Sequence, residues 1–352
     1  MKLDESSVSE SEPSKPLPPS QLIDRETLAK RLSLCNDNHH IAELRTILAE
    51  ANATLNECYR QNLDISDIVS SRAHLVDLVL EWVWSSQPEL QTNEIALAAV
   101  GGYGRSELMP YSDIDLLILT KKNSNKSYKE AIASFLAACW DLGLDIGQSV
   151  RSVKQCAQEA RKDITVATAL MESRTIAGST ELLPLMTAAT ATSKVWPTKA
   201  FLKAKVEEQK GRHAKYHDVD YALEPNVKNS PGGLRDIQTI AWVTKRHFGA
   251  ESFRDLTELG FLKPSEEAMI HKGQQFLWKL RYGLHYLSGR AEDRLLFNMQ
   301  KELAKLFGYE DDKSSLGVEK LMKQYYRAVA NLRELNDALL QHLNEAIVQA
   351  GA

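Results

Sequence analysis

The sequence predicts an α+β protein in which a domain with a small mixed sheet is followed by a helical bundle. Short apolar segments bounded by glycine or aspartate occur between residues 94 and 153, and such segments are typical of buried strands. Helical spacing of apolar residues precedes them and dominates the chain after residue 181. We therefore expect a tail over residues 1–20, a helical lead-in with the α/β domain over 21–180, and the bundle over 181–352.

The individual elements are predicted from local patterns. Residues 1–20 are rich in Ser, Pro and Glu and nearly free of large apolar side chains, so we expect them to be disordered. Residues 21–87 have helical spacing. Strands are expected at Glu94–Val100, Asp113–Leu119 and Leu144–Val153, with an amphipathic helix at Ser127–Gly143. In the second half the clearest predicted helices are residues 198–216, 234–248, 265–289 and 316–348, the last long enough for a bundle.

Composition excludes several classes of function. The formal net charge is −4 with acidic and basic residues interspersed, so the sequence lacks the basic surface that a nucleic acid polymer requires. The four cysteines are far apart and form no CxxC pair, which is typical of reduced thiols. No apolar run approaches the ~18–20 residues of a membrane span, and no signal peptide is recognisable. We expect a cytoplasmic protein that binds nucleotide as a small molecule, without a membrane partner.

The segment "VGGYGRSELMPYSDIDLLIL" (Val100–Leu119) indicates phosphate chemistry but matches neither of two common glycine motifs. A P-loop requires Gly-Lys-Ser/Thr after its glycines, whereas Arg105 follows Gly104. A dinucleotide fingerprint requires a helix that starts within the glycine run, in a βαβ unit of about 30 residues. Here Pro110 would interrupt such a helix, and the next strand begins near Asp113.

A third pattern fits this segment, namely the nucleotidyltransferase fold of which DNA polymerase beta is the type member. Its signature is a strand ending in Gly-Gly or Gly-Ser, followed shortly by Asp-x-Asp on an adjacent strand. Side chains two apart on a strand lie on the same side, so Asp113 and Asp115 would present paired carboxylates to Mg²⁺. Gly101 and Gly102 lack a Cβ, which lets backbone N–H groups approach a triphosphate.

Further candidate site residues accompany this motif. The fold usually has a third carboxylate on a neighbouring strand, and Asp145, between two apolar residues, is our candidate; the alternative is that it lies in a turn flanked by glycines. Asp163 is a weaker competitor that we expect near the start of a helix. Arg105 and Ser112 are candidate nucleotide contacts. The three carboxylates would hold two Mg²⁺ ions, as in two-metal transfer enzymes.

Three segments together resemble the bacterial PII uridylyltransferase/uridylyl-removing enzymes. "AVGGYGRSELMPYSDIDLLIL" is similar to the nucleotidyltransferase domain of that family. "YALEPNVKNSPGGLRDIQTIAWVTKRHFG" and "LRYGLHYLSGRAEDRLLFNMQKELAKLFGY" are similar to stretches that follow it, the latter in the family's helical domain. The resemblance runs from about residue 65 to residue 345, which is nearly all of the chain expected to be ordered.

This resemblance implies an activity, a substrate and a partner. It implies transfer of UMP from UTP to a tyrosine of the small nitrogen-regulatory protein PII, with release of pyrophosphate. It also implies that Gly101, Gly102, Asp113 and Asp115 belong to the active site, and Asp145 falls where the family has Asp or Glu. Two alternatives remain open: a related protein adenylyltransferase, and a module that senses nucleotide without transferring it. The choice of uracil rests on the resemblance alone.

The segment "PNVKNSPGGLRD" has two interpretations. Lys228 and Arg235 can reach phosphate or base at the junction of the domains, or the segment is a structural hinge before a helix that starts near Leu234. The family also has a hydrolase domain with a His-Asp doublet and two ligand-binding ACT domains, whereas this chain stops at Ala352. We therefore expect no removal of UMP from PII, and we interpret His217-Asp218 as a coincidence.

Several other residues are expected to be structural. His213 and His217 are four apart and could bind a metal from one helix face, but without a third ligand nearby we expect a solvated helix. The segment Lys245–Phe248 is predicted to be a helix C-terminal turn, where cations suit the helix dipole. The tryptophans on helices are expected to pack in the core or between domains, and these are Trp82, Trp140, Trp242 and Trp278.

Overall fold

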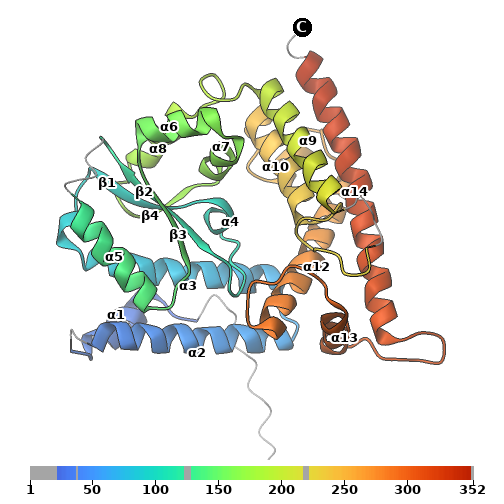
Figure 1. Ribbon diagram of the computed structural model, residues 1–352, viewed down its shortest axis with the longest axis horizontal. Coiled ribbons are helices and arrows are strands. Elements are labelled where there is room, and N and C mark those ends of the chain that lie inside the picture. Colours follow the sequence, from blue (N-terminus) through green and yellow to red (C-terminus); the bar gives the residue numbers. More distant parts are fainter. Residues whose placement is uncertain (1–21, 37–38, 123–127, 217–221, 350–352) are drawn as a thin grey trace, which may run out of the picture.

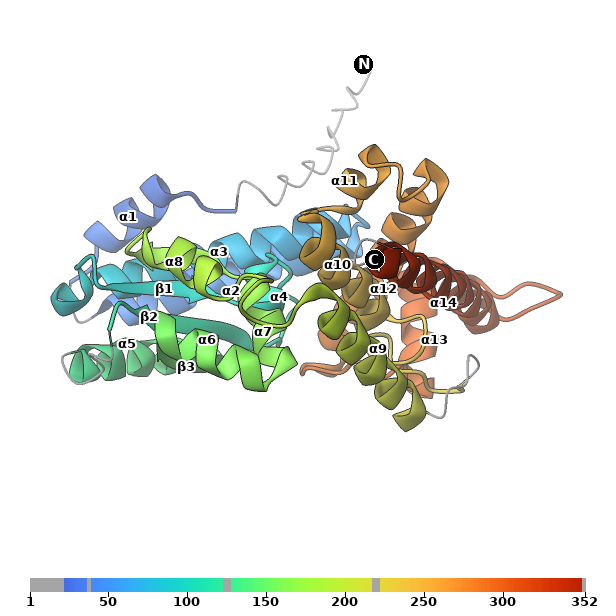
Figure 2. The same cartoon turned by 90° about the horizontal axis from the view of Figure 1, so that it is seen from above.

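The computed structural model describes residues 22–36, 39–122, 128–216 and 222–349, so the expected tail lies outside the described residues. The described chain has two parts that lie side by side, one built on a sheet and one made of helices (Figures 1 and 2). This arrangement confirms the predicted α+β class. Among the described helices, none is long and apolar enough to span a membrane.

In the described residues the sheet has four strands in the order β3-β2-β1-β4. β1 is antiparallel to both β2 and β4, whereas β2 and β3 are parallel, so the sheet is mixed as predicted. The three predicted strands are present, but β4 was not predicted, because it is only partly buried and has no continuous apolar run. The bounds are β1 Ile95–Ala99, β2 Ile114–Thr120, β3 Ile146–Ser152 and β4 Arg174–Gly178.

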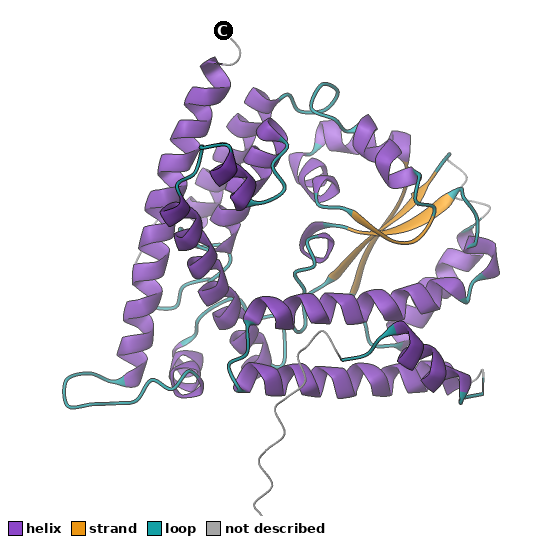
Figure 3. Ribbon diagram, turned by 180° about the vertical axis from the view of Figure 1, so that it is seen from behind, coloured by secondary structure: helices purple, strands orange, loops and turns teal. Residues whose placement is uncertain are grey.

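Helices cover both faces of the sheet (Figure 3). Alternate residues of a strand point to opposite faces, and in β2 Ile118 lies in one core cluster while Leu117 lies in another. Burial on both faces explains why the strands are continuous apolar runs. The first face is covered by α1 Arg25–Ser33, α2 His40–Arg60, α3 Ile65–Ser85 and α5 Lys129–Asp141, and the second by α6 Val153–Lys162, α7 Ile164–Met171 and α8 Leu182–Ala189.

The helix α8 packs on the sheet although it lies beyond residue 180. Leu182 and Met186 of α8 share a core cluster with Leu117 and Leu119 of β2. A division between residues 180 and 181 would separate these side chains. We therefore propose that the first part of the chain ends after α8 and that the bundle begins with α9.

The bundle is formed by six described helices around a leucine-rich core that includes Leu277, Leu303 and Leu343. The four helices predicted in this half are present with ends that agree to within one residue. The two shorter helices, α11 and α13, were not predicted. The bounds are α9 Thr198–Lys215, α10 Leu234–Phe248, α11 Phe253–Glu258, α12 Pro264–Ser288, α13 Phe297–Leu306 and α14 Gly317–Gln349.

The helical lead-in braces the bundle through α2 and α12. The Tyr59 hydroxyl donates to the Lys279 carbonyl at 2.8 Å, and the Tyr282 hydroxyl donates to Asn56 Oδ1 at 2.9 Å. A Cβ on Gly283 would lie 2.3 Å from the Tyr59 hydroxyl oxygen, so the two helices meet closely at this glycine. These contacts fix the bundle relative to the sheet and therefore fix the space between them.

One predicted packing residue is exposed. Trp140 has 58% of its surface exposed, so the prediction that it packs in the core or between domains is wrong. Helix α5 buries Phe135, Leu136 and Cys139 on one face, and Trp140 comes one residue after that face. The other three tryptophans on helices agree with the prediction: Trp242 is buried, and Trp82 and Trp278 are half-buried against the core.

Candidate active site

A cavity of about 800 Å³ lies where the sheet meets the bundle. Its wall on the sheet side comes from the turn after β1, the start of β2 and α7, and its other wall comes from α9, α10 and the segment between them. This volume is in the range of known small-molecule sites. The predicted site residues that line it are Gly101, Gly102, Arg105, Ser112, Asp113, Asp115, Lys228 and Arg235.

Asp113 and Asp115 lie together at the start of β2. Asp113 immediately precedes the strand and Asp115 is its second residue, so both side chains lie on one side. A Cβ on Gly147 of β3 would lie 2.6 Å from Asp115 Oδ1, and a Cβ on Gly101 would lie 3.5 Å from Asp115 Oδ2. Burial, and then the negative charge of Asp113, raise the pKa of the Asp115 carboxyl, whereas Lys228 lowers it.

The glycine turn after β1 forms the short helix α4, Gly101–Gly104. Gly101 has φ +60°, a conformation that glycine adopts without strain. A Cβ on Gly104 would lie 1.8 Å from the carbonyl oxygen of Glu172, so this position cannot carry a side chain. The Val100 N–H donates to the Asp115 carbonyl at 3.0 Å. The turn therefore lies directly against the strand that carries the aspartates.

Arg105 lines the cavity as a paired cation. Its Nη1 donates to Glu172 Oε2 at 2.6 Å and its Nη2 to Glu107 Oε2 at 2.9 Å. Burial by itself would lower the pKa of the Arg105 guanidinium, but the two carboxylates raise it. The Glu172 side chain is 7% exposed and also accepts a hydrogen bond from Trp242 Nε1 of α10. A triphosphate that contacts Arg105, as predicted from the sequence, would share it with these carboxylates.

The segment before α10 folds around Asn226. Asn226 Oδ1 accepts from the N–H groups of Lys228 at 3.1 Å and Asn229 at 2.8 Å, which is the pattern of an Asx turn. The Asn226 N–H donates in turn to Ser230 Oγ at 3.0 Å. This turn places Lys228 in the cavity wall, where burial, and then repulsion by Arg281, lower its pKa to about 8.

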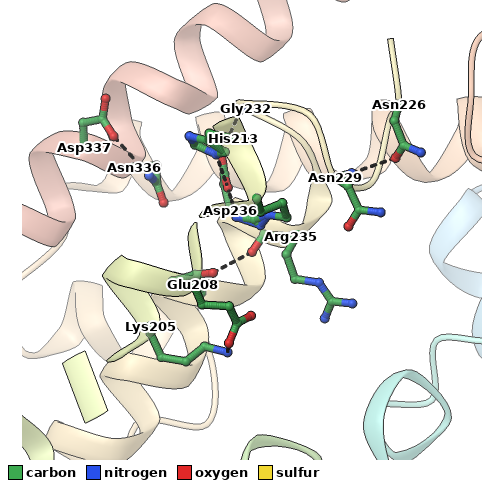
Figure 4. Close-up of polar contacts among 12 residues, drawn as sticks. Lys205, Glu208, His213, Asn226, Asn229, Gly232, Arg235, Asp236, Asn336 and Asp337 are labelled. Atoms are coloured by element: carbon green, nitrogen blue, oxygen red, sulfur yellow. Dashed lines mark hydrogen bonds and ion pairs between the residues drawn. The ribbon is translucent and has the colours of Figure 1, made fainter. Parts of the chain in front are cut away.

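The predicted turn before a helix at Leu234 is confirmed, and a buried carboxylate stabilises it. Asp236 of α10 accepts from the Gly232 N–H at 2.7 Å, lies 3.0 Å from His213 Nε2 and pairs with Arg212 (Figure 4). The prediction that His213 lies on a solvated helix face is therefore wrong, because this side chain is turned inward onto a buried anion. Its proposed companion, His217, and the His217-Asp218 doublet lie outside the described residues.

The Arg235 side chain points in another direction than that of its neighbour Asp236 and has other contacts. Figure 4 shows its guanidinium extending away from the Asp236 cluster. It lies over the Trp242 ring, with 5.3 Å between Arg235 Cζ and the ring centroid. Burial, and then repulsion by Arg105 and Arg212, lower the pKa of Arg235. Such a partly buried cation that is repelled by its neighbours favours the binding of an anion in the cavity.

The third predicted carboxylate lies beside the first two but not in the cavity wall. Asp145 immediately precedes β3, and its carbonyl accepts from the Ile114 N–H at 2.8 Å, which places it next to Asp113. Among the described residues no group of three or more His, Cys, Asp and Glu is close enough to hold a metal. The competitor Asp163 caps α7 as predicted, since its carboxylate accepts from the Thr165 N–H at 2.7 Å.

The paired carboxylates themselves fit a magnesium ion. Mg²⁺ takes oxygen ligands and is commonly held by one or two carboxylates together with substrate phosphates. Within the described part of the chain, Asp113 and Asp115 form no ion pair, so their oxygens are not already committed to a cation of the protein. The donor set thus agrees with a site that is completed by the substrate.

In comparisons with known proteins, each of the two parts of the chain matches a family model. Residues 80–167 match the family model "Nucleotidyltransferase domain", and residues 200–340 match "GlnD PII-uridylyltransferase". The bifunctional uridylyltransferase/uridylyl-removing enzyme of Stutzerimonas stutzeri (strain A1501) is 48% identical over 331 residues, which are 94% of this chain and 37% of that protein. The chain belongs to this family. The glycine turn and Asp113 lie in the first matched range, and Lys228 and Arg235 lie in the second.

Two other members of the family show the same relation. The enzyme of Pseudomonas syringae pv. syringae (strain B728a), which has the same name, is 50% identical over 308 residues, or 88% of this chain and 34% of the relative. That of Pseudomonas aeruginosa (strain LESB58) is 48% identical over 328 residues, or 93% and 36%. The chain therefore spans little more than a third of the length of the curated relatives that it matches.

Several residues that line this cavity were missed by sequence reasoning, because they come from distant elements. Lys205 is 1% exposed, with its Nζ 2.7 Å from Glu208 and 4.2 Å from the centroid of the Trp242 ring. Asp293 accepts from Arg281 Nε at 2.6 Å. The only available signal was the helical spacing of Lys205, Glu208, Arg212 and Lys215, and charged residues at that spacing are usually a solvated face.

Proposed function

We propose that this chain transfers UMP from UTP to a tyrosine of PII and releases pyrophosphate. The observation that carries the transfer of a nucleotide is the distribution of charge across one cavity, whereas UMP and PII are proposed from the family. Within the described residues, Asp113 and Asp115 on one wall form no ion pair, and neither do Lys215, Lys228 and Arg235 on the other. A metal-bound nucleoside triphosphate has both charges that such a cavity complements, a cation for the carboxylates and a polyanion for the basic wall.

Each group of residues has a role in this proposal. The backbone of Gly101 and Gly102 approaches the triphosphate, and Ser112 and Arg105 contact it from the same wall. Lys228 and Arg235 bind it from the bundle and stabilise the negative charge that develops on the leaving pyrophosphate. The acceptor tyrosine must lose its proton, and its ordinary pKa is about 10. Asp113 and Asp115 are the carboxylates of the cavity wall that the tyrosine oxygen would approach.

The proposed metal ligands are Asp113 and Asp115, which line the cavity and would hold Mg²⁺ together with the triphosphate. Asp145, the predicted third ligand, lies outside the cavity wall and would have to move toward the pair to share a metal with them. When bound, Mg²⁺ would supply Lewis-acid chemistry that favours loss of the tyrosine proton and neutralises charge on pyrophosphate. The protein's own contribution is to hold the carboxylates, the glycine turn and the basic wall at fixed positions, so that substrate and acceptor meet in a suitable orientation.

Mass spectrometry of PII after incubation with this chain, UTP and Mg²⁺ tests the proposal directly. We expect UMP on a tyrosine of PII, and we expect none with Asp113→Asn. Unmodified PII in the presence of a folded, wild-type chain and effectors of PII would count against the proposal. ATP that displaces a bound analogue better than UTP would favour the adenylyltransferase alternative. If the chain binds nucleotide but releases pyrophosphate with none of the acceptors tried, the result would favour the alternative of a module that senses nucleotide.

A further inference from the structure

We propose that Glu172 is a positioning residue that holds the nucleotide-binding turn in place against the bundle. Glu172 caps the C-terminus of α7 and lies two residues before β4. Its backbone and its side chain contact different parts of the turn, and its side chain also contacts the bundle. The proposed consequence for nucleotide binding rests on the proposed function, whereas the effect on the turn does not.

The first contact fixes the turn. The Glu172 carbonyl lies so close to Gly104 that a Cβ there would be 1.8 Å from its oxygen. The Glu172 carboxylate accepts from Arg105 Nη1 at 2.6 Å, and Arg105 Nη2 lies 3.6 Å from where a Cβ of Gly102 would be. A single residue therefore limits the position of both the backbone of α4 and the guanidinium that lies beside it.

The second contact reaches the bundle. Glu172 Oε1 accepts from Trp242 Nε1, while Oε2 accepts from Arg105, so each carboxylate oxygen has its own partner. Trp242 is 3% exposed, and its ring supports the cations of Lys205 and Arg235. The carboxylate thus links the glycine turn to the face of α10 that carries a proposed phosphate ligand.

A second cavity supports this role. It has a volume of about 610 Å³ and shares four lining residues with the first, namely Arg105, Glu107, Glu172 and Trp242. These hydrogen-bonded side chains therefore separate the two cavities. Because the Glu172 side chain is only 7% exposed and both of its oxygens accept hydrogen bonds within the protein, it is suited to orient its partners rather than to bind substrate or metal.

Amide hydrogen exchange of the free chain tests the effect on the turn without nucleotide. For Glu172→Gln, which removes the charge and places an NH₂ group against a donor of either Arg105 or Trp242, we expect exchange at residues 101–105 to become about 10- to 100-fold faster. Glu159→Gln is the matched control, since it removes an exposed ion pair with Lys162 on α6. Unchanged exchange at residues 101–105 in a folded Glu172→Gln protein would overturn the inference.

Calorimetric titration with UTP and Mg²⁺ tests the consequence for binding. We expect Glu172→Gln to weaken binding about tenfold, and we expect the double variant with Arg105→Gln to lose clearly less than the two single losses combined, because Glu172 acts in part through Arg105. Additive losses would overturn this role. If Glu172→Gln fails to fold, Glu172→Asp replaces it, because this variant keeps the charge but shortens the side chain. If the wild-type chain bound neither UTP nor ATP, the proposed function would be wrong. The exchange experiment would still decide whether Glu172 positions the turn.

Discussion

The surroundings of Asp115 disfavour the ionised form of its carboxyl group. Burial and the neighbouring Asp113 raise its pKa above the usual value of aspartate, and a carboxyl whose pKa is raised by folding destabilises the folded state at every pH above that pKa. We predict that Asp115→Asn lowers UMP transfer at least about 100-fold, because a metal ligand is lost, yet leaves the unfolding temperature unchanged or higher at pH 7. The gain should shrink as the pH falls through the raised pKa of the folded state and vanish below the usual pKa of an unfolded aspartate. A lower unfolding temperature at pH 7 would contradict this account.

Lys228 makes the site sensitive to alkaline pH. Burial and repulsion by Arg281 lower its pKa to about 8, so in the free protein its charge is present below that pH and is lost as the pH rises through it. We predict that the KM for UTP rises between pH 7 and pH 9. Lys228→Arg should bind UTP with little pH dependence over this range, because arginine stays protonated. The same rise in KM in both proteins would assign the effect to another group.

At the scale of elements, the turn before α10 depends on a glycine for two separate reasons. Gly232 has φ +72°, and a Cβ there would lie 2.1 Å from the Val329 carbonyl oxygen of α14. Gly249, at the end of α10, has φ +71° but no atom within 4 Å of a Cβ. We predict that Gly249→Ala costs about 1–2 kcal/mol in the free energy of unfolding, and that Gly232→Ala costs about 1–3 kcal/mol more. Urea denaturation measures both, and equal losses would show that the contact with α14 is unimportant.

At the scale of the whole molecule, the lead-in and the bundle meet closely where α2 contacts α12. A Cβ on Gly283 would lie 2.3 Å from the Tyr59 hydroxyl oxygen and 2.4 Å from Leu303 Cδ2, so Gly283→Ala should separate the lead-in from the bundle and lower stability by about 1–3 kcal/mol. Gly211→Ala is the matched control, because Gly211 is also within a helix but has open space around it, and it should raise stability by up to about 1 kcal/mol. Thermal unfolding measures both variants. A Gly283→Ala protein as stable as the wild type would contradict the prediction.

The sequence by itself determined most of the elements and the acidic motif at the start of β2. The strands at β1, β2 and β3 and the four long helices of the bundle follow from short-range periodicity, and the spacing of Asp113 and Asp115 within one strand fixes that both carboxylates lie on the same side. The turn before Leu234 was also predictable, because proline favours the start of a turn and glycine readily adopts the left-handed conformation that Gly232 has here. The functional prediction was confirmed at the level of the family, whereas PII, its tyrosine and the two metals remain proposals.

Only the tertiary structure decided what lies opposite the carboxylates. Glu172 meets Arg105 across 67 residues of chain and Trp242 across 70, and His213 finds its anion 23 residues away in Asp236. Trp140 has the composition of a core residue but lies one position past the buried face of its helix. Such outcomes depend on how helices pack against one another, and packing is set by many weak contacts between distant segments that leave no local pattern in the sequence.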